Sequence, residues 1–547
     1  MTALTLFDPI VAAWFRERLG EPTAVQAEAW ARVARGEHVL VAAETGSGKT
    51  LAAFLHAINA LLTGAVEGGG LRVLYVSPLK ALGADVRENL AGPLSELRRR
   101  FLAAGREVQP VRVMTRSGDT PQAERRTMLR RPPEILVTTP ESLHLLLTSR
   151  GGRGMLGGVR LVILDEIHAL AGNRRGTLLS VGVERLAQMC GEFQRVALSA
   201  TVRPEAVLAR FVGGYRLSGE ADGPVHEPRA VSVVRGVAAK PIQVVVRVPT
   251  RPGERVAGDF FEPFAAAWRE MLFANRTTAF FIDSRRMSEK VAGLINAGAD
   301  PPVVYPHHGS LSREVRQAVE RRLKSGTLRG VTATGSLELG IDVGDLDAVA
   351  LIQTPPSVSA AVQRVGRSGH RVGAVRRGVF FPLTDLETAL CGVMARAAVD
   401  GDIEDVAVVM QPLDVLAQVL LSMTAHEAVA VDRLYARVRC AYPYHDLPRR
   451  QFDLVLDMLA GRFGQARPRE LAAKVFFDRV AGTVLARPGA ALSIYASGGV
   501  IPDRGTYVAR VAGQEGGASG GVVAELDEEF VFEARVGQVF GVGGQGW

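Results

Sequence analysis

The chain has 547 residues, of which 47% are hydrophobic and 22% are charged, with 59 glycines and 28 prolines. This composition is typical of a folded protein of about three or four domains and excludes a disordered or collagen-like chain. Lys and Arg number 65 against 57 Asp and Glu, so the net charge of +8 permits a polyanionic partner such as nucleic acid without requiring one.

Cysteine usage and apolar runs indicate the compartment. Cys190, Cys391 and Cys440 lie far apart with no Cys-x-x-Cys pair, which argues against a disulfide framework or a structural zinc site and favours a reducing compartment. The amino terminus lacks the pattern of a signal peptide, and no stretch approaches the roughly 18 apolar residues of a membrane span. We therefore expect a soluble, cytoplasmic protein with no membrane partner.

The first part of the chain alternates short apolar runs with amphipathic segments. Strands that crossover helices bury on both faces are continuously apolar, as these runs are. Residues 51–62 place apolar side chains at helical spacing after the first run. We expect an α/β lobe over residues 1–217, with a parallel sheet flanked by helices. The expected strands are 39–41, 73–76, 135–137, 161–164 and 196–198.

A polar stretch rich in Gly and Pro at 218–240 is interpreted as a linker. The same alternation then begins again, with a helical pattern over residues 314–324. The sequence therefore predicts a second α/β lobe, in tandem with the first, over residues 241–400. Its expected strands are 278–282, 303–305, 330–334, 348–352 and 378–381.

The remaining chain changes character twice. Residues 401–470 carry apolar stripes at helical spacing, which predict a small helical module. Residues 471–547 are Gly-rich and strand-like and end soon after the apolar run 536–542. We expect a β-containing carboxy-terminal domain that is cut short, because an apolar strand at a free terminus leaves a core unfinished.

A phosphate-binding loop is predicted at residues 43–50, Ala-Glu-Thr-Gly-Ser-Gly-Lys-Thr, between the first expected strand and its helix. The glycines let backbone N–H groups converge on phosphate oxygens, and the helix amino terminus adds partial positive charge. Lys49 supplies a point charge between the β- and γ-phosphates, and Thr50 is placed to bind Mg²⁺. Ala43 stands where the strict pattern has its first glycine, whereas Gly46 and Gly48 are present.

An acidic pair, Asp165-Glu166, directly follows the expected strand 161–164. The pair should emerge at the carboxyl edge of the sheet, where the phosphate loop also lies. An NTPase needs a carboxylate on its magnesium and a group that orients the attacking water. We expect Asp165 to hold Mg²⁺ and Glu166 to act as the base. A solvated turn is the alternative for such a pair considered alone.

The predicted phosphate loop and the acidic pair, together with further motifs along the chain, resemble those of superfamily 2 helicases of the DExH-box type. The details of these motifs look most like the large helicase-related (Lhr) group. The resemblance covers residues 7 to about 420. It rests on 7–9 with 14–15, Thr23 and Gln26 (the adenine-reading element), 77–82, 115–121, 139–143, 165–168, 199–201, 307–312, 335–342, 363–370 and 411–418. The resemblance implies two RecA-like lobes, a winged-helix module at 401–470 and a partial DNA-contacting domain at 471–547.

The resemblance also assigns roles around the nucleotide. Gln26 is expected to hydrogen bond the adenine edge, and Arg367 is expected to act as an arginine finger, with Arg364 as a weaker candidate. The expected catalytic residues are Lys49, Asp165, Glu166, Arg367 and Arg364, with Thr50 and Asp165 on Mg²⁺. The expected ATP-binding residues are Thr23, Gln26, Thr45, Gly46, Ser47, Gly48, Lys49, Thr50, Gly340 and Asp342. The expected residues that couple nucleotide to strand are His168, Ser199, Thr201 and His370.

The motifs that resemble the strand-binding elements imply a nucleic-acid track. Their counterparts in the family touch the sugar-phosphate backbone, and such contacts tolerate many sequences and weaken with salt. The expected contact residues are Lys80, Arg116, Thr139, Ser284, Arg285, His308, Ser310 and Thr334.

The resemblance predicts an ATP- and Mg²⁺-dependent translocase that moves 3′-to-5′ on single-stranded DNA, unwinds DNA or RNA:DNA duplexes and acts in DNA repair. Two alternatives stay open. One is an RNA helicase, because contacts to phosphate and ribose do not separate DNA from RNA. The other is a nucleic-acid-binding scaffold whose ATP site only regulates docking, with no motor activity.

Overall fold

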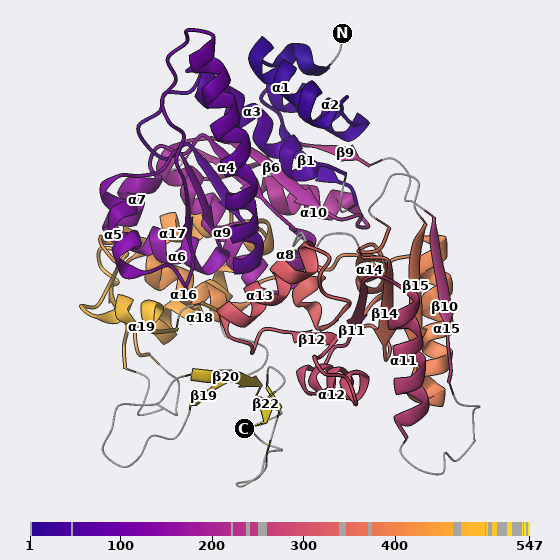
Figure 1. Ribbon diagram of the computed structural model, residues 1–547. Helices are drawn as coiled ribbons and strands as arrows, with labels where there is room; N and C mark the ends of the chain where they lie inside the picture. Colours follow the sequence, from indigo (N-terminus) through magenta and orange to yellow (C-terminus); the bar gives the residue numbers. More distant parts are fainter. Residues whose placement is uncertain are drawn as a thin grey trace, which may run out of the picture. The chain divides into compact units, whose positions relative to one another are not determined.

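We describe a computed structural model of the chain. The structure describes residues 3–44, 47–219, 223–236, 241–249, 260–338, 346–369, 375–462, 472–497, 499–500, 506–510, 522–527, 539, 541–542 and 545–546. The chain forms two compact units (Figure 1). Unit 1 comprises residues 1–237 and 405–501, and unit 2 comprises residues 238–404 and 502–547. The chain therefore leaves unit 1, builds most of unit 2, returns to unit 1, and ends in unit 2.

Unit 1 contains a seven-stranded parallel sheet in the order β3-β4-β2-β5-β6-β1-β9. Its strands are β1 (His38–Ala42), β2 (Val73–Val76), β3 (Val113–Arg116), β4 (Ile135–Thr138), β5 (Leu161–Leu164), β6 (Gln194–Ser199) and β9 (Val231–Arg235). β1, β2, β4 and β5 are almost entirely buried, which explains their continuous apolar sequences. The five strands expected from the sequence in this lobe are confirmed.

Helices cover both faces of this sheet. Alternate strand residues enter two separate apolar clusters, one for each face. The first face is covered by α1 (Pro9–Leu19), α2 (Ala24–Ala34), α3 (Lys49–Thr63) and α4 (Lys80–Ala103). The second is covered by α5 (Gln122–Arg130), α6 (Pro140–Thr148), α7 (Arg150–Leu156), α8 (His168–Ala171), α9 (Arg174–Cys190) and α10 (Glu205–Gly213). A short 3-10 helix, Ala3–Leu6, precedes α1.

The interpretation of residues 218–240 as a linker was wrong in part. This segment contains β8 (Val225–Pro228), which pairs with β7 (Tyr215–Ser218) as an antiparallel hairpin, and then β9. β9 pairs in parallel with β1 and so extends the main sheet. Gly219, Gly223 and Pro224 lie between β7 and β8, whereas 231–234 reads Val-Ser-Val-Val, a pattern that favours a strand.

Residues 405–500 form a winged-helix arrangement. Three helices, α16 (Leu413–Met423), α17 (Val431–Val438) and α18 (Arg449–Leu459), pack with a small antiparallel sheet and α19 (Ala490–Ser497) around one apolar cluster. The sheet has the order β16-β18-β17, from strands Val429–Ala430, Thr483–Ala486 and Val475–Asp478. A boundary at residue 470 is therefore misplaced, because it separates the helices from the two strands of their own wing.

This winged-helix module packs on α9 of the first lobe. Leu178 and Val181 of α9 belong to the same buried cluster as α16 and α18. Thr148 shares a buried 2.6 Å hydrogen bond with Ser422, and its carbonyl accepts one from His426 at 2.7 Å. The module and α9 of the first lobe thus share an apolar cluster, distinct from the two clusters on the faces of the sheet.

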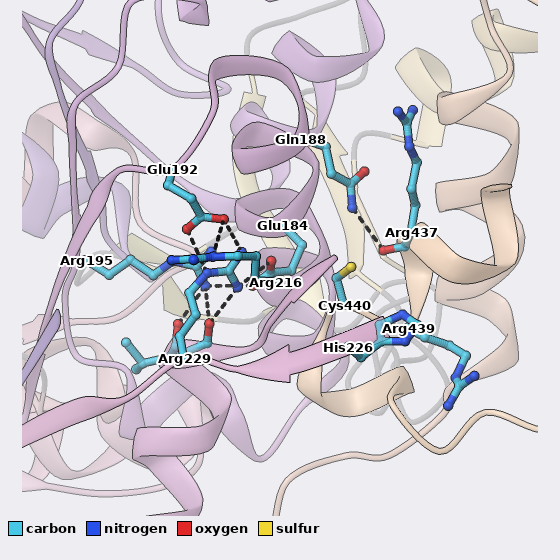
Figure 2. Close-up of polar contacts among 12 residues, drawn as sticks. Glu184, Gln188, Glu192, Arg195, Arg216, His226, Arg229, Arg437, Arg439 and Cys440 are labelled. Carbon is cyan, nitrogen blue, oxygen red and sulfur yellow. Dashed lines mark hydrogen bonds and ion pairs between the residues drawn. The ribbon is translucent and has the colours of Figure 1, made fainter. Parts of the chain in front are cut away.

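A charged network reinforces this packing (Figure 2). Arg195 is 1% exposed and donates to Glu184 at 2.6 Å. Arg229 contacts both Glu184, at 3.0 Å, and Glu192, at 2.8 Å. Beside it, Gln188 donates to the carbonyl of Arg437 at 3.1 Å. The network therefore lies where α9, β6 and the β7–β8 hairpin meet the winged helix.

Unit 2 contains a six-stranded parallel sheet in the order β10-β15-β14-β11-β13-β12. Its strands are β10 (Ile242–Val246), β11 (Thr278–Phe281), β12 (Val304–His307), β13 (Gly330–Ala333), β14 (Ala348–Ile352) and β15 (Arg376–Phe381). Its helices are α11 (Glu262–Ala274), α12 (Arg285–Asn296), α13 (Arg313–Lys324), α14 (Val358–Val365) and α15 (Asp385–Asp400). All five strands expected in this lobe are confirmed.

The structure adds β10 and two short 3-10 helices, which the sequence did not predict, and it places short strands in the carboxy-terminal part that was expected to contain β-structure. β10 is the edge strand of the second sheet, and its Ile-Gln-Val-Val-Val sequence alternates in burial. The short strands of the carboxy-terminal part are β19 (Thr506–Arg510) with β20 (Val522–Asp527), and β21 (Gly541–Val542) with β22 (Gln545–Gly546). Short 3-10 helices span Gly335–Leu337 and Tyr442–Tyr444. Among the described residues, no helix combines the length and apolarity needed to cross a membrane.

Candidate functional site

The predicted phosphate loop joins β1 to α3. Gly48 caps α3 with a left-handed φ of 80°, and a Cβ there would lie 2.4 Å from Nε2 of Gln26. Only glycine fits this position. Ser47 Oγ donates to the carbonyl of Glu44 at 2.7 Å. Thr45 and Gly46 lie outside the described residues.

Lys49 is buried at the base of this loop. Its ammonium donates to the carbonyl oxygens of Ala43 at 2.5 Å and Ser199 at 3.0 Å. Binding of a phosphate would require the ammonium to exchange carbonyl oxygens for phosphate oxygens. Thr50, the next residue, is exposed.

Gln26 lies against the phosphate loop. Its Oε1 accepts from the backbone of Thr23 at 3.0 Å in a capping box that begins α2, and its Nε2 donates to the carbonyl of Gly48 at 3.3 Å. Thr23 Oγ1 also donates to the carbonyl of Ser47 at 3.4 Å. The structure therefore fastens the expected adenine-reading element directly to the loop.

Asp165 and Glu166 follow β5 at the carboxyl edge of the sheet, and both are buried. Burial and the neighbouring Glu166 raise the pKa of Asp165 to about 7. Asp165 Oδ1 accepts from the backbone N–H of Glu166 at 2.9 Å, and Oδ2 accepts from the phenol of Tyr75. Glu166 adopts a left-handed φ of 46°, a strained conformation of the kind that clusters at functional sites.

His168 connects this acidic pair to the end of β6. Its Nδ1 accepts from the backbone N–H of Ala200 at 3.1 Å and lies 3.4 Å from Ser199 Oγ and 3.5 Å from Glu166 Oε2. Thr201 is exposed at the end of the same turn. Three expected coupling residues of unit 1 thus adjoin the predicted nucleotide site. His370 lies outside the described residues.

The donor set fits a magnesium ion held mostly by nucleotide phosphates. Mg²⁺ prefers oxygen ligands and in such sites uses one or two protein groups. Asp165 supplies a buried carboxylate, and Thr50 supplies an exposed hydroxyl at the start of α3. Within the described part of the chain, no cluster of three or more His, Cys, Asp or Glu side chains could hold a metal by itself.

The expected strand-binding residues of unit 1 gather at the same edge of the sheet. Arg116 ends β3 and is the register neighbour of Thr138 on β4. Thr139 caps α6, and its hydroxyl accepts from the backbone of Ser142 at 3.4 Å. Burial and Arg125 lower the pKa of Arg116 to about 10. Lys80 begins α4.

The expected strand-binding residues of unit 2 also come together. Arg285 donates to Ser310 Oγ at 2.7 Å, and Ser284 caps α12 just before it. The backbone of Thr334 approaches the carbonyl of His307 at 3.4 Å. His308 is buried, and its Nε2 lies 3.0 Å from Glu289 Oε1, so its imidazole is not presented to solvent.

The two arginines of residues 363–370 are buried within unit 2. Arg364 contacts Asp283 at 2.5 Å and Glu338 at 3.0 Å, while Arg367 donates to the carbonyl of Glu338 at 2.7 Å. Burial raises the pKa of Glu338. Gly340 and Asp342 lie outside the described residues.

Three family models match this chain. They are the DEAD/DEAH box helicase model at residues 23–209, the helicase conserved C-terminal domain at 266–372, and the winged helix domain of large helicase-related protein at 396–547. The helicase Lhr of Mycobacterium smegmatis, whose structure has been solved bound to ssDNA and AMP-PNP, is 40% identical, with a TM-score of 0.84 over 100% of this chain and 68% of that one. This chain belongs to the Lhr family of superfamily 2 ATP-dependent helicases.

Relatives within the Lhr family are longer. The Lhr helicase/uracil glycosylase of Escherichia coli is 40% identical over 99% of this chain and 38% of that protein. The ATP-dependent helicase Lhr-Core protein 2 of Thermococcus barophilus is 37% identical over 99% of this chain and 62% of that protein. This Lhr-type chain thus spans about two fifths to three fifths of the length of these relatives.

Two residues at the Lhr-type site escaped the sequence reasoning. Arg175 of α9 donates to Glu141 at 2.5 Å and to the carbonyl of Pro78 at 2.6 Å, and so joins two of the segments that are expected to bind the strand. Tyr75 contacts Asp165. Tyr75 lies in an apolar strand, where tyrosine is a common residue. No motif or spacing in the sequence therefore distinguished it from a core residue.

The exit of the chain from unit 1 also lies beside the site. Gly236 follows β9, and its backbone N–H donates to the carbonyl of Ala42 at 2.8 Å. A Cβ at this position would lie 2.9 Å from the Cβ of Ala43, the first residue of the phosphate-loop segment. The close approach therefore requires glycine.

Proposed function

We propose that this chain is the motor portion of an ATP-dependent DNA helicase that moves 3′-to-5′ on single-stranded DNA and unwinds DNA or RNA:DNA duplexes, in the service of DNA repair. The observation that carries the proposal is the continuous contact from Gln26 and Lys49 through Ser199 to His168 and Glu166. A change at the phosphates can therefore reach the loop that follows β6.

Lys49 is proposed to bind the β- and γ-phosphates, and Glu166 to accept a proton from the attacking water. Mg²⁺, when bound by Asp165 and Thr50, would neutralise charge on the phosphates. Arg367 is proposed as the arginine finger, and Arg364 orders Glu338 and Asp283 beside it.

DNA is proposed as the tracking strand because a 40% identical Lhr has been solved with ssDNA. Arg116 and Thr139 in unit 1, and Arg285 and Ser310 in unit 2, are proposed to line the path of the backbone. Such contacts predict binding that weakens with salt and tolerates many sequences.

The domain division is also part of the proposal. We assign residues 1–217, together with β9, to the first ATP-binding lobe and residues 241–400 to the second. The winged-helix module is assigned to 401–500, with its wing included. The remaining residues are proposed to extend the nucleic-acid surface.

The test is steady-state ATP hydrolysis with Mg²⁺, alone and with single-stranded DNA, single-stranded RNA or duplex DNA. We expect single-stranded DNA to stimulate the rate, and Lys49→Ala and Glu166→Gln to abolish it. If RNA but not DNA stimulated ATP hydrolysis, RNA would replace DNA as the proposed substrate. ATP binding without stimulation by any nucleic acid would favour a scaffold.

Direction is tested with tailed duplexes. We expect unwinding of DNA:DNA and RNA:DNA duplexes that carry a 3′ single-stranded DNA tail, with little unwinding from a 5′ tail. Unwinding that requires a 5′ tail would reverse the proposed polarity.

A further inference from the structure

Tyr75 is buried in the middle of the first lobe, on the face of the sheet that α3 covers. It is 0% exposed, and its ring stacks on Phe54 of α3 with centroids 5.2 Å apart at 29°. A buried phenol needs a hydrogen-bond partner, because leaving it unpaired is costly. The identity of that partner decides what the hydroxyl does.

The partner is Asp165, and the sheet register makes the contact. β2 and β5 are parallel neighbours in which Tyr75 pairs with Ile163 and Val76 with Leu164. The backbone N–H of Asp165 donates to the carbonyl of Val76 at 2.9 Å, which carries the pairing one residue beyond β5. Asp165 therefore projects on the same face as Tyr75, and the phenol donates to its Oδ2.

Both oxygens of this carboxylate are held. The backbone N–H of Glu166 donates to Oδ1 at 2.9 Å, and Tyr75 donates to Oδ2. Two donors on different oxygens fix rotation about the bond between Cβ and the carboxylate. Hydrogen bonds of this kind to a metal-binding carboxylate orient it and support metal affinity.

Comparison with another buried tyrosine separates this contact from ordinary packing. Tyr444 of the winged-helix module is also 0% exposed, but its hydroxyl donates to the backbone carbonyl of Pro412 at 2.7 Å. Tyr444 thus satisfies its phenol within the core. Tyr75 instead donates its hydrogen bond to the carboxylate of Asp165, at the carboxyl edge of the sheet.

We propose that Tyr75 is a positioning residue, which holds Asp165 in the orientation that receives the magnesium of the bound nucleotide. The inference rests on the proposed ATP site. Phe54 belongs to the helix that begins at the phosphate loop, so α3 also fixes the ring that carries the donor.

The experiment uses the full chain and a fluorescent ATP analogue titrated at a series of Mg²⁺ concentrations, and again in EDTA. Tyr75→Phe removes one oxygen and keeps the ring against Phe54. We expect the Mg²⁺ concentration at half-maximal binding to rise about tenfold, the effect of losing one hydrogen bond to a charged group. Binding in EDTA is expected to stay at the wild-type level, which also reports that the variant is folded.

Two further variants separate positioning from packing. Tyr444→Phe is the matched control and is expected to leave the Mg²⁺ dependence unchanged. In an Asp165→Asn background, Tyr75→Phe is expected to have no further effect on the Mg²⁺ dependence, because the carboxylate that it positions is absent.

The outcomes are distinct. A Tyr75→Phe variant with the wild-type Mg²⁺ midpoint would overturn the inference and leave the ATP site standing. An equal shift in Tyr444→Phe would also overturn it, since the effect would then belong to the core. If the wild-type chain binds no nucleotide, the proposed ATP site fails and the inference fails with it.

Discussion

The Nδ1 atom of His168 accepts a hydrogen bond from the backbone N–H of Ala200 at 3.1 Å. His168 follows the acidic pair after β5, and Ala200 lies at the turn after β6, so this one contact joins two motifs that lie apart in the sequence. We expect His168→Ala to lower the stimulation of ATP hydrolysis by single-stranded DNA about fivefold, the effect of one neutral hydrogen bond. The affinity for ATP should change little.

His168→Asn is the matched variant for this prediction, because its side-chain oxygen can accept the same hydrogen bond. It should retain more of the stimulation than His168→Ala does. If both variants lost the stimulation by single-stranded DNA equally, the hydrogen-bond acceptor at residue 168 would not carry the coupling.

The buried network in Figure 2 predicts a large effect on stability. Glu184 is the carboxylate between Arg195 and Arg229, so Glu184→Gln leaves two buried guanidinium groups without their shared charge partner. We expect the free energy of unfolding to fall by about 3–5 kcal/mol in urea titrations. Glu205→Gln, which breaks the ion pair with the exposed Arg235, should lower the free energy of unfolding much less.

The shared core of α9 and the winged helix predicts that a mutation in the first lobe destabilises both. Leu178 of α9 is 1% exposed within the cluster that includes α16 and α18. Leu178→Ala should cost about 2–5 kcal/mol in chemical denaturation. Leu454→Ala on α18, where the side chain is 59% exposed, should be nearly neutral. Similar losses in the two variants would contradict the packing.

His144 predicts a loss of stability in acid. Burial, with Arg185 nearby, lowers the pKa of His144 to about 3. An unfolded histidine titrates near pH 6.5, so between these values the unfolded chain binds more protons than the folded one, and stability falls as the pH drops. At pH 5 this linkage amounts to about 2 kcal/mol.

The check is urea unfolding of wild type and His144→Gln at pH 7.5 and pH 5. The variant should be less stable at pH 7.5, because a buried group is replaced, but its loss of stability between the two pH values should be smaller by about 2 kcal/mol. The same pH slope in both proteins would place the acid sensitivity elsewhere.

The place of the phosphate-loop segment between β1 and α3, the place of the acidic pair after β5, and ten strands could be predicted because each signal is contiguous in the sequence. Lys49 follows glycines at fixed spacing, and Asp165 follows a four-residue apolar strand. Such patterns reflect local backbone geometry and burial, which neighbouring residues determine. The two-lobe architecture followed from their repetition.

The partners of those residues could not be predicted in the same way. Tyr75 meets Asp165, and Arg175 meets Glu141, only because strands and helices distant in the sequence become neighbours in the fold. β9 was mistaken for linker because the surrounding Gly and Pro residues obscured a short strand that tertiary pairing with β1 completes. The end of the winged-helix module was placed too early, at residue 470, because two strands of its wing follow the helices in the sequence.

The position of Gly236 has a mechanical consequence. This residue packs on Ala43 at the start of the phosphate-loop segment, and the chain crosses into unit 2 directly after residue 237. The chain crosses between the two units after residues 237, 404 and 501, and Gly236, just before the first of these crossings, packs beside the predicted phosphate loop. A displacement carried along this crossing would therefore act beside Ala43, at the start of the phosphate-loop segment.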